Sequence, residues 1–383
     1  MKNNVECVEK CYGCSACFNI CPTKCISMRP NKRGFLEPIV DKEKCINCGA
    51  CIKICPRLKK YDKEKKHEIK TFIVKNNKDI RNISTSGGFF SVVADYFIKN
   101  KGVIYGCIVD KNLKIVHVRT EKDYSRMRGS KYVQSELTNT FSLIKKDLLD
   151  NRLVLFTGSP CQCAGLRSYL GKDYDNLYIL DFICHGPQSP LLWSEYIKFL
   201  TEKKGKIKDY NFRTKINGWH SHTEVVEFEN GEKEYDTLDT NINKELFHLG
   251  LSLREACYDC QFTSLNRIGD ITMGDAWGLE KINPSFDDNL GTSLIIVNSN
   301  KGQNLFDKIK SNVVYEEQNI EDYITYNPRL KNSRPNSKKR EEFWKLYDKK
   351  GFKGVIKKYT GYNKVKKIKK FIRTILIKLH LWK

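Results

Sequence analysis

Two stretches of the sequence share one thiol spacing: CYGCSACFNICP at residues 11–22 and CINCGACIKICP at residues 45–56. Each reads Cys-x2-Cys-x2-Cys-x3-Cys-Pro. Three closely spaced thiolates can wrap one corner of an iron–sulfur cubane, while the fourth cysteine, stiffened by the following proline, turns away. Where two such runs occur together, the remote cysteine of each run binds the cluster of the other.

The spacing therefore predicts an electron relay of two 4Fe-4S clusters. The ligands of the first are predicted to be Cys11, Cys14, Cys17 and Cys55. Those of the second are predicted to be Cys45, Cys48, Cys51 and Cys21. The alternatives are a zinc ribbon or buried structural thiols, but zinc sites usually carry two Cys pairs with no third thiol and no Cys-Pro exit. Cys7, Cys25 and Cys107 lie outside the pattern, and we expect none of them to bind metal.

Composition limits the class of protein. The N-terminal MKNNVECVEK has no signal-peptide core, and no stretch approaches the roughly 18 apolar residues of a membrane span. We expect a cytoplasmic protein, in which 16 cysteines indicate metal or redox chemistry rather than disulfides. The net charge of +23 first suggests nucleic acid, but residues 351–383 carry eleven Lys or Arg and no acid. Because nearly half of the excess lies in one tail, we expect no nucleic-acid partner.

The pattern divides the chain into four parts. Residues 1–57 are the cysteine-rich module, and residues 58–70 form a charged linker that we expect to be too polar to pack. From residue 71 to about 345, strands alternate with helices, which predicts an α/β body with a mixed sheet. Expected strands include 222–229, 269–274 and 292–298, and an amphipathic helix is expected at 87–100. Residues 346–383 form a basic tail.

Further cysteines occur in the body, and four of them predict a third site. RLVLFTGSPCQCAGLRSYL (152–170) and NLYILDFICHG (176–186) predict a strand, a helix and a second parallel strand. Loops after both strands would meet at one sheet edge, where α/β folds bind ligands. The third 4Fe-4S cluster is predicted to be held by Cys161, Cys184, Cys257 and Cys260. The alternative is that the first two are small buried residues and the CYDC pair (257–260) is a zinc knuckle or binds nothing.

Five motifs together resemble one protein family. They are STSGGFFSVVADYF, GSKYVQS, TGSPCQCAGL, DFICHGP and GDITMGDAWG, in this order over about 84–278. The sequence resembles the beta-subunit family of coenzyme F420 hydrogenases and dehydrogenases. The resemblance implies an iron–sulfur flavoprotein with FAD in the α/β body, which exchanges electrons with a small organic redox substrate. Coenzyme F420 is one candidate substrate.

Several residues then become candidates for FAD or for catalysis. The predicted cofactor-binding residues are Ser86, Gly87, Gly88, Lys131, Tyr132, Gly158, Asp270, Gly274 and Asp275. The Ser-Gly-Gly turn presents backbone N–H groups to a phosphate, although many helices use such residues simply as caps. Lys131 and Tyr132 would supply a cation and a stacking ring, or else belong to a solvated loop. His185 is the candidate proton donor, and Arg213 either anchors an anion or pairs with a surface acid.

The leading hypothesis is an iron–sulfur flavoprotein oxidoreductase, with a ferredoxin or another reductase subunit as its redox partner. The alternative is an electron-transfer subunit, without catalysis of its own, that serves a separate enzyme. The tail YNKVKKIKKFIRTILIKLHLWK (362–383) has apolar residues at helical spacing with Lys and Arg between them. It suits peripheral contact with the inner face of a membrane or an acidic partner, or else docks on the body.

Overall fold

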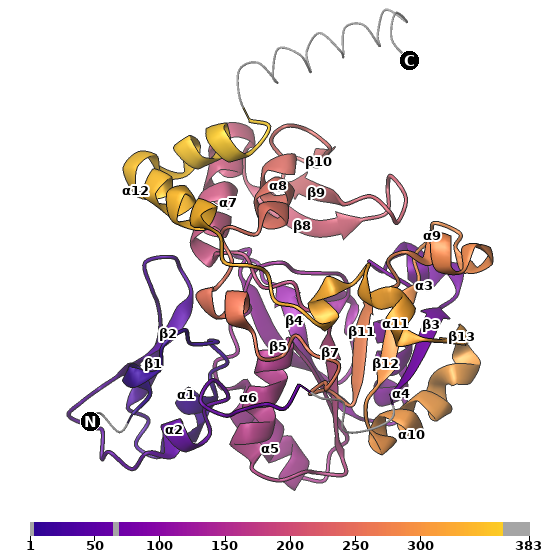
Figure 1. Ribbon diagram of the computed structural model, residues 1–383, viewed down its shortest axis with the longest axis horizontal. Coiled ribbons are helices and arrows are strands. Elements are labelled where there is room, and N and C mark those ends of the chain that lie inside the picture. Colours follow the sequence, from indigo (N-terminus) through magenta and orange to yellow (C-terminus); the bar gives the residue numbers. More distant parts are fainter. Residues whose placement is uncertain (1–3, 64–68, 363–383) are drawn as a thin grey trace, which may run out of the picture.

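The computed structural model describes residues 4–63 and 69–362, and it begins with a small cysteine-rich lobe (Figure 1). Helix α1 (Ala16–Ile20) and helix α2 (Ala50–Lys53) carry the third cysteine of each repeat. Each helix follows a residue in the left-handed region, Ser15 with φ 60° and Gly49 with φ 70°. Strands β1 (Ile26–Pro30) and β2 (Leu36–Val40) pair antiparallel between the repeats. The repeated thiol spacing therefore folds twice into one local geometry.

The body is built on a mixed sheet of eight strands, so the predicted α/β class is confirmed. The strand order is β13-β3-β12-β11-β7-β6-β4-β5, and the four strands β11, β7, β6 and β4 run parallel to one another. The remaining pairs in this sheet are antiparallel. The strands are β3 (Lys70–Lys75), β4 (Val103–Val109), β5 (Ile115–Thr120), β6 (Val154–Thr157), β7 (Leu177–Phe182), β11 (Ile271–Asp275), β12 (Ser293–Val297) and β13 (Val314–Gln318).

Helices cover both faces of this sheet because side chains alternate along each strand. Leu155 of β6 joins the core under α4 (Phe89–Lys99) and α10 (Asn300–Ile309). Its neighbours Val154 and Phe156 join the opposite core, under α5 (Thr140–Leu149) and α6 (Pro160–Leu170). The shorter helices of the body are α3 (Lys78–Asn82), α9 (Leu279–Ile282) and α11 (Ile320–Ile324).

A second, three-stranded sheet lies apart from the large one, at the top of Figure 1. Its strands are β8 (Ile207–Thr214), β9 (Thr223–Phe228) and β10 (Lys233–Tyr235), all antiparallel. They share a core with α7 (Pro190–Lys204), α8 (Asn241–Leu249) and α12 (Lys338–Tyr359). The strand expected at 222–229 therefore exists, but it belongs to this separate layer.

The charged linker packs against the body, contrary to our expectation. Lys59 Nζ donates to Ser168 Oγ at 3.1 Å, and the ring of Tyr61 lies 4.8 Å from that of Phe262. Ser264 Oγ donates to the carbonyl of Lys63 at 2.9 Å. Among its described residues, Lys59, Lys60, Asp62 and Lys63 are exposed, while the Lys63 carbonyl and the Tyr61 ring contact the body.

The tail that we expected to begin at residue 346 instead begins inside a core helix, Lys338–Tyr359, in which Phe352, Val355 and Ile356 are buried. Of the amphipathic stretch 362–383, residues 363–383 lie outside the described residues. No helix of the described residues is long and apolar enough to cross a membrane.

Candidate metal centre and the adjoining polar site

Four thiols of the lobe form what we call the front site: Cys11, Cys14, Cys17 and Cys55. Burial raises the pKa of Cys14 well above its usual value, and the charges of the other three thiols raise it further. Burial and the charges of Cys11 and Cys55 likewise raise the pKa of Cys17. Four thiols in mutual electrostatic range within an apolar setting fit a polynuclear cation that is bound as thiolates. The structure thus brings the first predicted ligand set together.

The hairpin site is the second predicted set: Cys21, Cys45, Cys48 and Cys51. All four line one small cavity of ≈ 20 Å³, next to the ends of β1 and β2. Cys25, which we expected to stand apart from the metal sites, lines the same cavity. The hairpin and front sites are neighbours, because the charge of Cys51 reaches both Cys17 and Cys55.

The body site consists of Cys161, Cys184, Cys257 and Cys260, which come from three separate segments. Burial raises the pKa of Cys257 well above its usual value, and the charges of Cys184, Cys260 and Cys161 raise it further. Burial raises the pKa of Cys184 to about 12, and the charge of Cys161 adds to this. The parallel pairing of β6 with β7 places the ends of both strands at one edge of the sheet, as predicted. Cys184 lies in the loop after β7, whereas Cys161 lies in the first turn of α6 and not in a loop.

A buried arginine holds the segments of the body site together. Arg267 donates to the carbonyl of Phe182, two residues before Cys184, at 2.9 Å, and to that of Phe262, two residues after Cys260, at 3.0 Å. Its charge is balanced by Asp181 at 3.3 Å, and both side chains are almost fully buried. One side chain therefore sets the distance between two of the three cysteine segments.

A second arginine joins the lobe to the body. Arg254 precedes Cys257 by three residues, and its guanidinium donates to the carbonyls of Cys11 and Leu36, both at 2.7 Å. Its Nε donates to Gln134 at 2.8 Å. Gly13 leaves space for this contact, because a Cβ there would lie 2.6 Å from the Arg254 guanidinium.

The front site and the body site lie against each other across helix α6. A Cβ on Gly165 would lie 2.9 Å from Cys14 Sγ, so the glycine admits the thiol to the helix surface. Cys161 stands four residues earlier, one turn along the same helix face. Tyr12 follows Cys11 in the sequence and is 4% exposed. Burial raises the pKa of Tyr12 to about 12, and the charge of Cys260 adds to this increase. The three thiol sets therefore form one contiguous series.

His185 lies beside the body site in a strongly cationic setting. Burial lowers its pKa to about 4, and the charges of Arg334 and Arg329 lower it further, while Asp275 opposes the change. The imidazole is therefore neutral at neutral pH. Within the described part of the chain, Arg329 Nη1 is buried and has no hydrogen-bond partner. This arrangement suits an anionic group near His185.

Asp275 and Arg213 form a buried pair at the end of β11. Arg213 Nη1 lies 2.6 Å from Asp275 Oδ2, and Trp219 Nε1 donates to Asp275 Oδ1 at 3.3 Å. The partner of Arg213 is thus another predicted site residue and not a surface acid. The charge of Asp275 also reaches Tyr132, so the two predicted residues share one electrostatic environment.

The segment 130–134 is not a solvated loop. Lys131 Nζ donates to four backbone carbonyls of residues 126–129, at 2.7–3.2 Å. The Tyr132 ring stacks on Phe247, with centroids 4.2 Å apart. In this structure Lys131 orders its own loop, and one face of the Tyr132 ring is already covered.

The Ser-Gly-Gly turn joins β3 and β12 before α4 begins. Ser86 Oγ donates to the carbonyl of Thr292 at 2.9 Å, and Gly87 N donates to Ser293 Oγ at 3.0 Å. A Cβ on Gly87 would lie 2.2 Å from the carbonyl oxygen of Val74, so close strand approach requires glycine there. Gly88 has φ 79° and directly precedes α4.

The other predicted cofactor residues have structural partners. Asp270, 3% exposed, accepts from Ile179 N at 2.8 Å and from Ser299 Oγ at 2.9 Å. We expected Gly274 to admit a ligand, but Ile183 occupies that space, since a Cβ would lie 2.4 Å from its Cδ1. Gly158 packs against the ring of Phe156 in the turn between β6 and α6.

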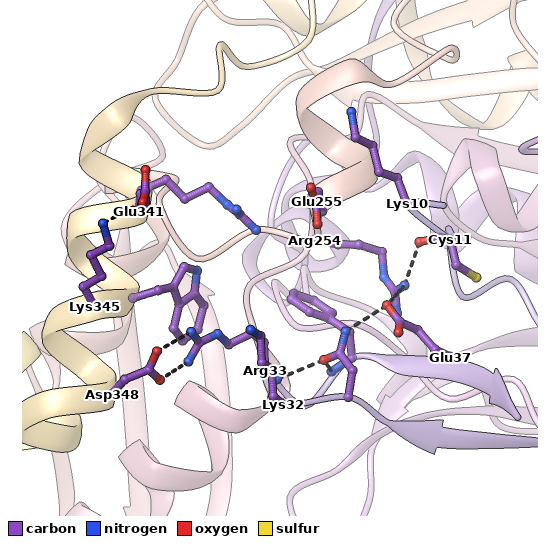
Figure 2. A pocket seen from close by; sticks show the side chains of 14 residues that line it. Lys10, Cys11, Lys32, Arg33, Glu37, Arg254, Glu255, Glu341, Lys345 and Asp348 are labelled. Atoms are coloured by element: carbon purple, nitrogen blue, oxygen red, sulfur yellow. Dashed lines mark hydrogen bonds and ion pairs between the residues drawn. The ribbon is translucent and has the colours of Figure 1, made fainter. Parts of the chain in front are cut away.

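A cavity opens at the seam between the lobe and α12 (Figure 2). It measures ≈ 330 Å³, and Cys11 of the front site is among its lining residues. Arg33 and Asp348 face one another from the hairpin and from α12, with contacts of 2.5 and 2.8 Å. None of the predicted FAD residues lines this cavity or the hairpin-site cavity.

Sequence reasoning missed the residues that assemble these sites. Arg254 and Arg267 carry no recognisable motif, because their partners are backbone carbonyls far away in the sequence. Gln188 was also missed: it is fully buried, and neither atom of its side-chain amide has a hydrogen-bond partner among the described residues. Its backbone N–H donates to the carbonyl of Tyr132 at 2.8 Å, so it adjoins the GSKYVQS segment.

Known families match both the lobe and the body. Residues 151–323 match the family model for the C terminus of the beta subunit in coenzyme F420 hydrogenase/dehydrogenase. Residues 10–58 match a 4Fe-4S dicluster domain, and residues 40–81 match a 4Fe-4S single cluster domain of ferredoxin I. No curated protein has a matching sequence. A chain of the F420-reducing NiFe hydrogenase complex from Methanosarcina barkeri, solved as a xenon derivative, resembles this chain with a TM-score of 0.46 and 15% identity, covering 76% of this chain and 95% of that one.

Proposed function

From the premise that this chain joins a 4Fe-4S dicluster domain to a C-terminal domain of the coenzyme F420 hydrogenase/dehydrogenase beta-subunit family, we propose that it is an iron–sulfur flavoprotein oxidoreductase. It transfers electrons between its thiol-bound clusters and a small organic redox substrate with the help of FAD. A coenzyme F420-like molecule is one candidate for that substrate.

The contact between the front site and the body site carries the proposal. Cys14 meets α6 at Gly165, one turn from Cys161, and Tyr12 lies between the front-site loop and Cys260. The hairpin site continues the series outward through Cys51. Such a series leads electrons from the lobe into the carboxyl edge of the parallel strands, where α/β folds hold their ligands.

FAD would be held at that edge by residues of this chain. Four of the predicted FAD residues or turns remain candidates at that edge: the Ser86–Gly88 turn, the ring of Tyr132, the turn at Gly158 and Asp275. The orphaned amide of Gln188 adds a buried donor and acceptor, which fit a polar planar ring. When bound, a flavin supplies exchange between one-electron and two-electron transfer. Three of the predicted FAD residues instead contact other parts of the protein: Asp270, Gly274 and Lys131. Because these contacts leave fewer residues to bind FAD, they favour the alternative of a non-catalytic electron-transfer subunit.

The substrate is expected to be anionic. Burial lowers the pKa values of Arg329 and Arg334, and the charge of Arg334 lowers the pKa of Arg329 further. Both charges also lower the pKa of His185. A negatively charged substrate would relieve this repulsion. The neutral imidazole of His185, predicted from the sequence as a proton donor, can at neutral pH donate only an N–H hydrogen bond to the charge that develops as the substrate accepts electrons.

Anaerobic purification followed by cofactor extraction tests the proposal. We expect a flavin in near-stoichiometric amount, and dithionite-reduced protein that reduces an anionic two-electron acceptor faster than a cationic one. A His185→Ala variant should keep its flavin and iron but reduce the acceptor about 10²-fold more slowly, as for loss of one hydrogen-bond donor to a developing negative charge. A brown protein without flavin, which also takes up none, would establish the electron-carrier alternative.

We assign the docking of the electron donor to the cavity at the seam between the lobe and α12. Lys32 and Arg340 have no carboxylate within ion-pair distance among the described residues, and the buried Trp344 Nε1 has no acceptor there. The ammonium of Lys32, in the cavity that Cys11 also lines, suits a carboxylate of an acidic electron-carrier protein, which would then lie next to the front site.

Reversing charge at this cavity should slow electron uptake. In a Lys32→Glu/Lys345→Glu variant, we expect reduction by a reduced acidic ferredoxin to slow about tenfold at low ionic strength. The difference should shrink as salt screens the charges. Lys308→Glu on α10, across the molecule from the lobe in Figure 1, is the matched control and should react as the wild type does. Equal slowing in both variants, or slowing that salt does not change, would contradict this docking site.

A further inference from the structure

The hairpin site contains one thiol more than a cubane needs. Its cavity is lined by Cys21, Cys25, Cys45, Cys48 and Cys51. The repeat assigns Cys45, Cys48, Cys51 and Cys21 to the cluster, and this leaves Cys25 over. Cys25 is only 6% exposed and lines the same cavity as the assigned ligands, of which Cys51 is buried and Cys48 is exposed.

A tight turn places Cys25 beside Cys21. Lys24 adopts φ 52°, in the left-handed region, and its N–H donates to the carbonyl of Cys21 at 3.2 Å. The two sulfur atoms consequently lie 3.3 Å apart, and Cys25 N lies 3.4 Å from Cys21 Sγ. Asp41 N donates to the carbonyl of Cys25 at 2.7 Å, which ties the residue to the end of β2. The sheet, and not the metal site, therefore holds Cys25 in place.

We propose that Cys25 is a reserve ligand of the hairpin-site cluster, which takes the place of Cys21 when that thiolate dissociates from the iron. This inference rests on the cluster assignment in the proposed function. In the exchange, the bond between iron and Cys21 sulfur breaks and one between iron and Cys25 sulfur forms. The proton of the Cys25 thiol passes to the departing Cys21 thiolate, so no electron is gained or lost.

The duplicated motif provides an internal control. Cys55 is the counterpart of Cys21, since both are the fourth cysteine of a repeat and both precede a proline. Four residues after Cys55 stands Lys59, whose Nζ donates to Ser168 Oγ. The front site thus lacks a thiol at the position of Cys25, and only the hairpin site is expected to survive the loss of its remote ligand.

The experiment measures iron per chain, the visible and EPR spectra, and alkylation of Cys25 by iodoacetamide, on anaerobically purified full-length variants. Cys25→Ala should match the wild type. Cys21→Ala should retain its iron, with an altered spectrum and with Cys25 protected from alkylation. Cys21→Ala/Cys25→Ala should lose about four irons, and so should Cys55→Ala.

Two outcomes would overturn the inference. If Cys21→Ala loses as much iron as the double variant, Cys25 does not ligate. If both keep their iron equally, the cluster survives on three thiolates and Cys25 is again not its ligand. Cys45→Ala/Cys48→Ala separates these results from failure of the assignment itself, because unchanged iron after loss of two of the four assigned thiols would mean that the hairpin site holds no cluster.

Discussion

Replacing Cys257 with serine is expected to lower the iron content from about twelve to about eight atoms per chain and to stop electron flow into the body. Cys257 is buried and lies within electrostatic range of the three other thiols of the body site. Its replacement therefore removes one of four ligands, and no other described cysteine is placed to take over. The front and hairpin sites stand on their own cysteines and should still accept electrons from dithionite. Metal analysis and optical titration under anaerobic conditions check both expectations.

Cys163→Ala is the matched control for this prediction. Cys163 lies two residues after Cys161 on the same helix, but its side chain is fully buried in the core under α5 and α6. Its removal should leave about twelve irons. A wild-type protein with about eight irons and one zinc would instead make the body site a zinc site. Unchanged iron in Cys257→Ser would exclude a cluster held by this residue.

Arg267→Met should cost about 3–5 kcal/mol of unfolding free energy, because it leaves the buried Asp181 carboxylate without its cation. The same change removes the tether that joins the Phe182 and Phe262 carbonyls. The loops that carry Cys184 and Cys260 would then separate, and we expect the body-site iron to be lost as well. Denaturant unfolding and iron analysis of the anaerobic protein measure the two effects.

Arg167→Met controls for the chemistry of the substitution. Arg167 also pairs with a buried acid of the sheet, Asp270 at 3.3 Å, but its side chain is 33% exposed and it touches neither cysteine loop. We expect a smaller loss of stability and the full iron content. Body-site iron that survives in Arg267→Met would show that the cysteine loops hold their positions without this arginine.

The sequence alone predicted what depends on local spacing. The thiol repeats indicated both dicluster ligand sets, because a cubane corner requires cysteines a few residues apart. Alternation of apolar segments predicted the α/β body, and the strand–helix–strand order at 152–183 predicted that Cys161 and Cys184 share a sheet edge. The linker was misjudged, since composition does not reveal that Tyr61 finds Phe262 or that Ser264 finds a carbonyl.

Tertiary structure decided what depends on contacts between distant segments. Arg267 binds backbone carbonyls in two of the three body-site segments, and Arg254 binds backbone carbonyls of the lobe; such acceptors leave no trace in residue identity. The fold of the backbone likewise determines that Cys14 approaches Gly165 and that Cys25 turns back to Cys21. Motif spacing states which atoms can bind one metal centre, whereas the packing of the whole chain determines which centres touch and where electrons can go.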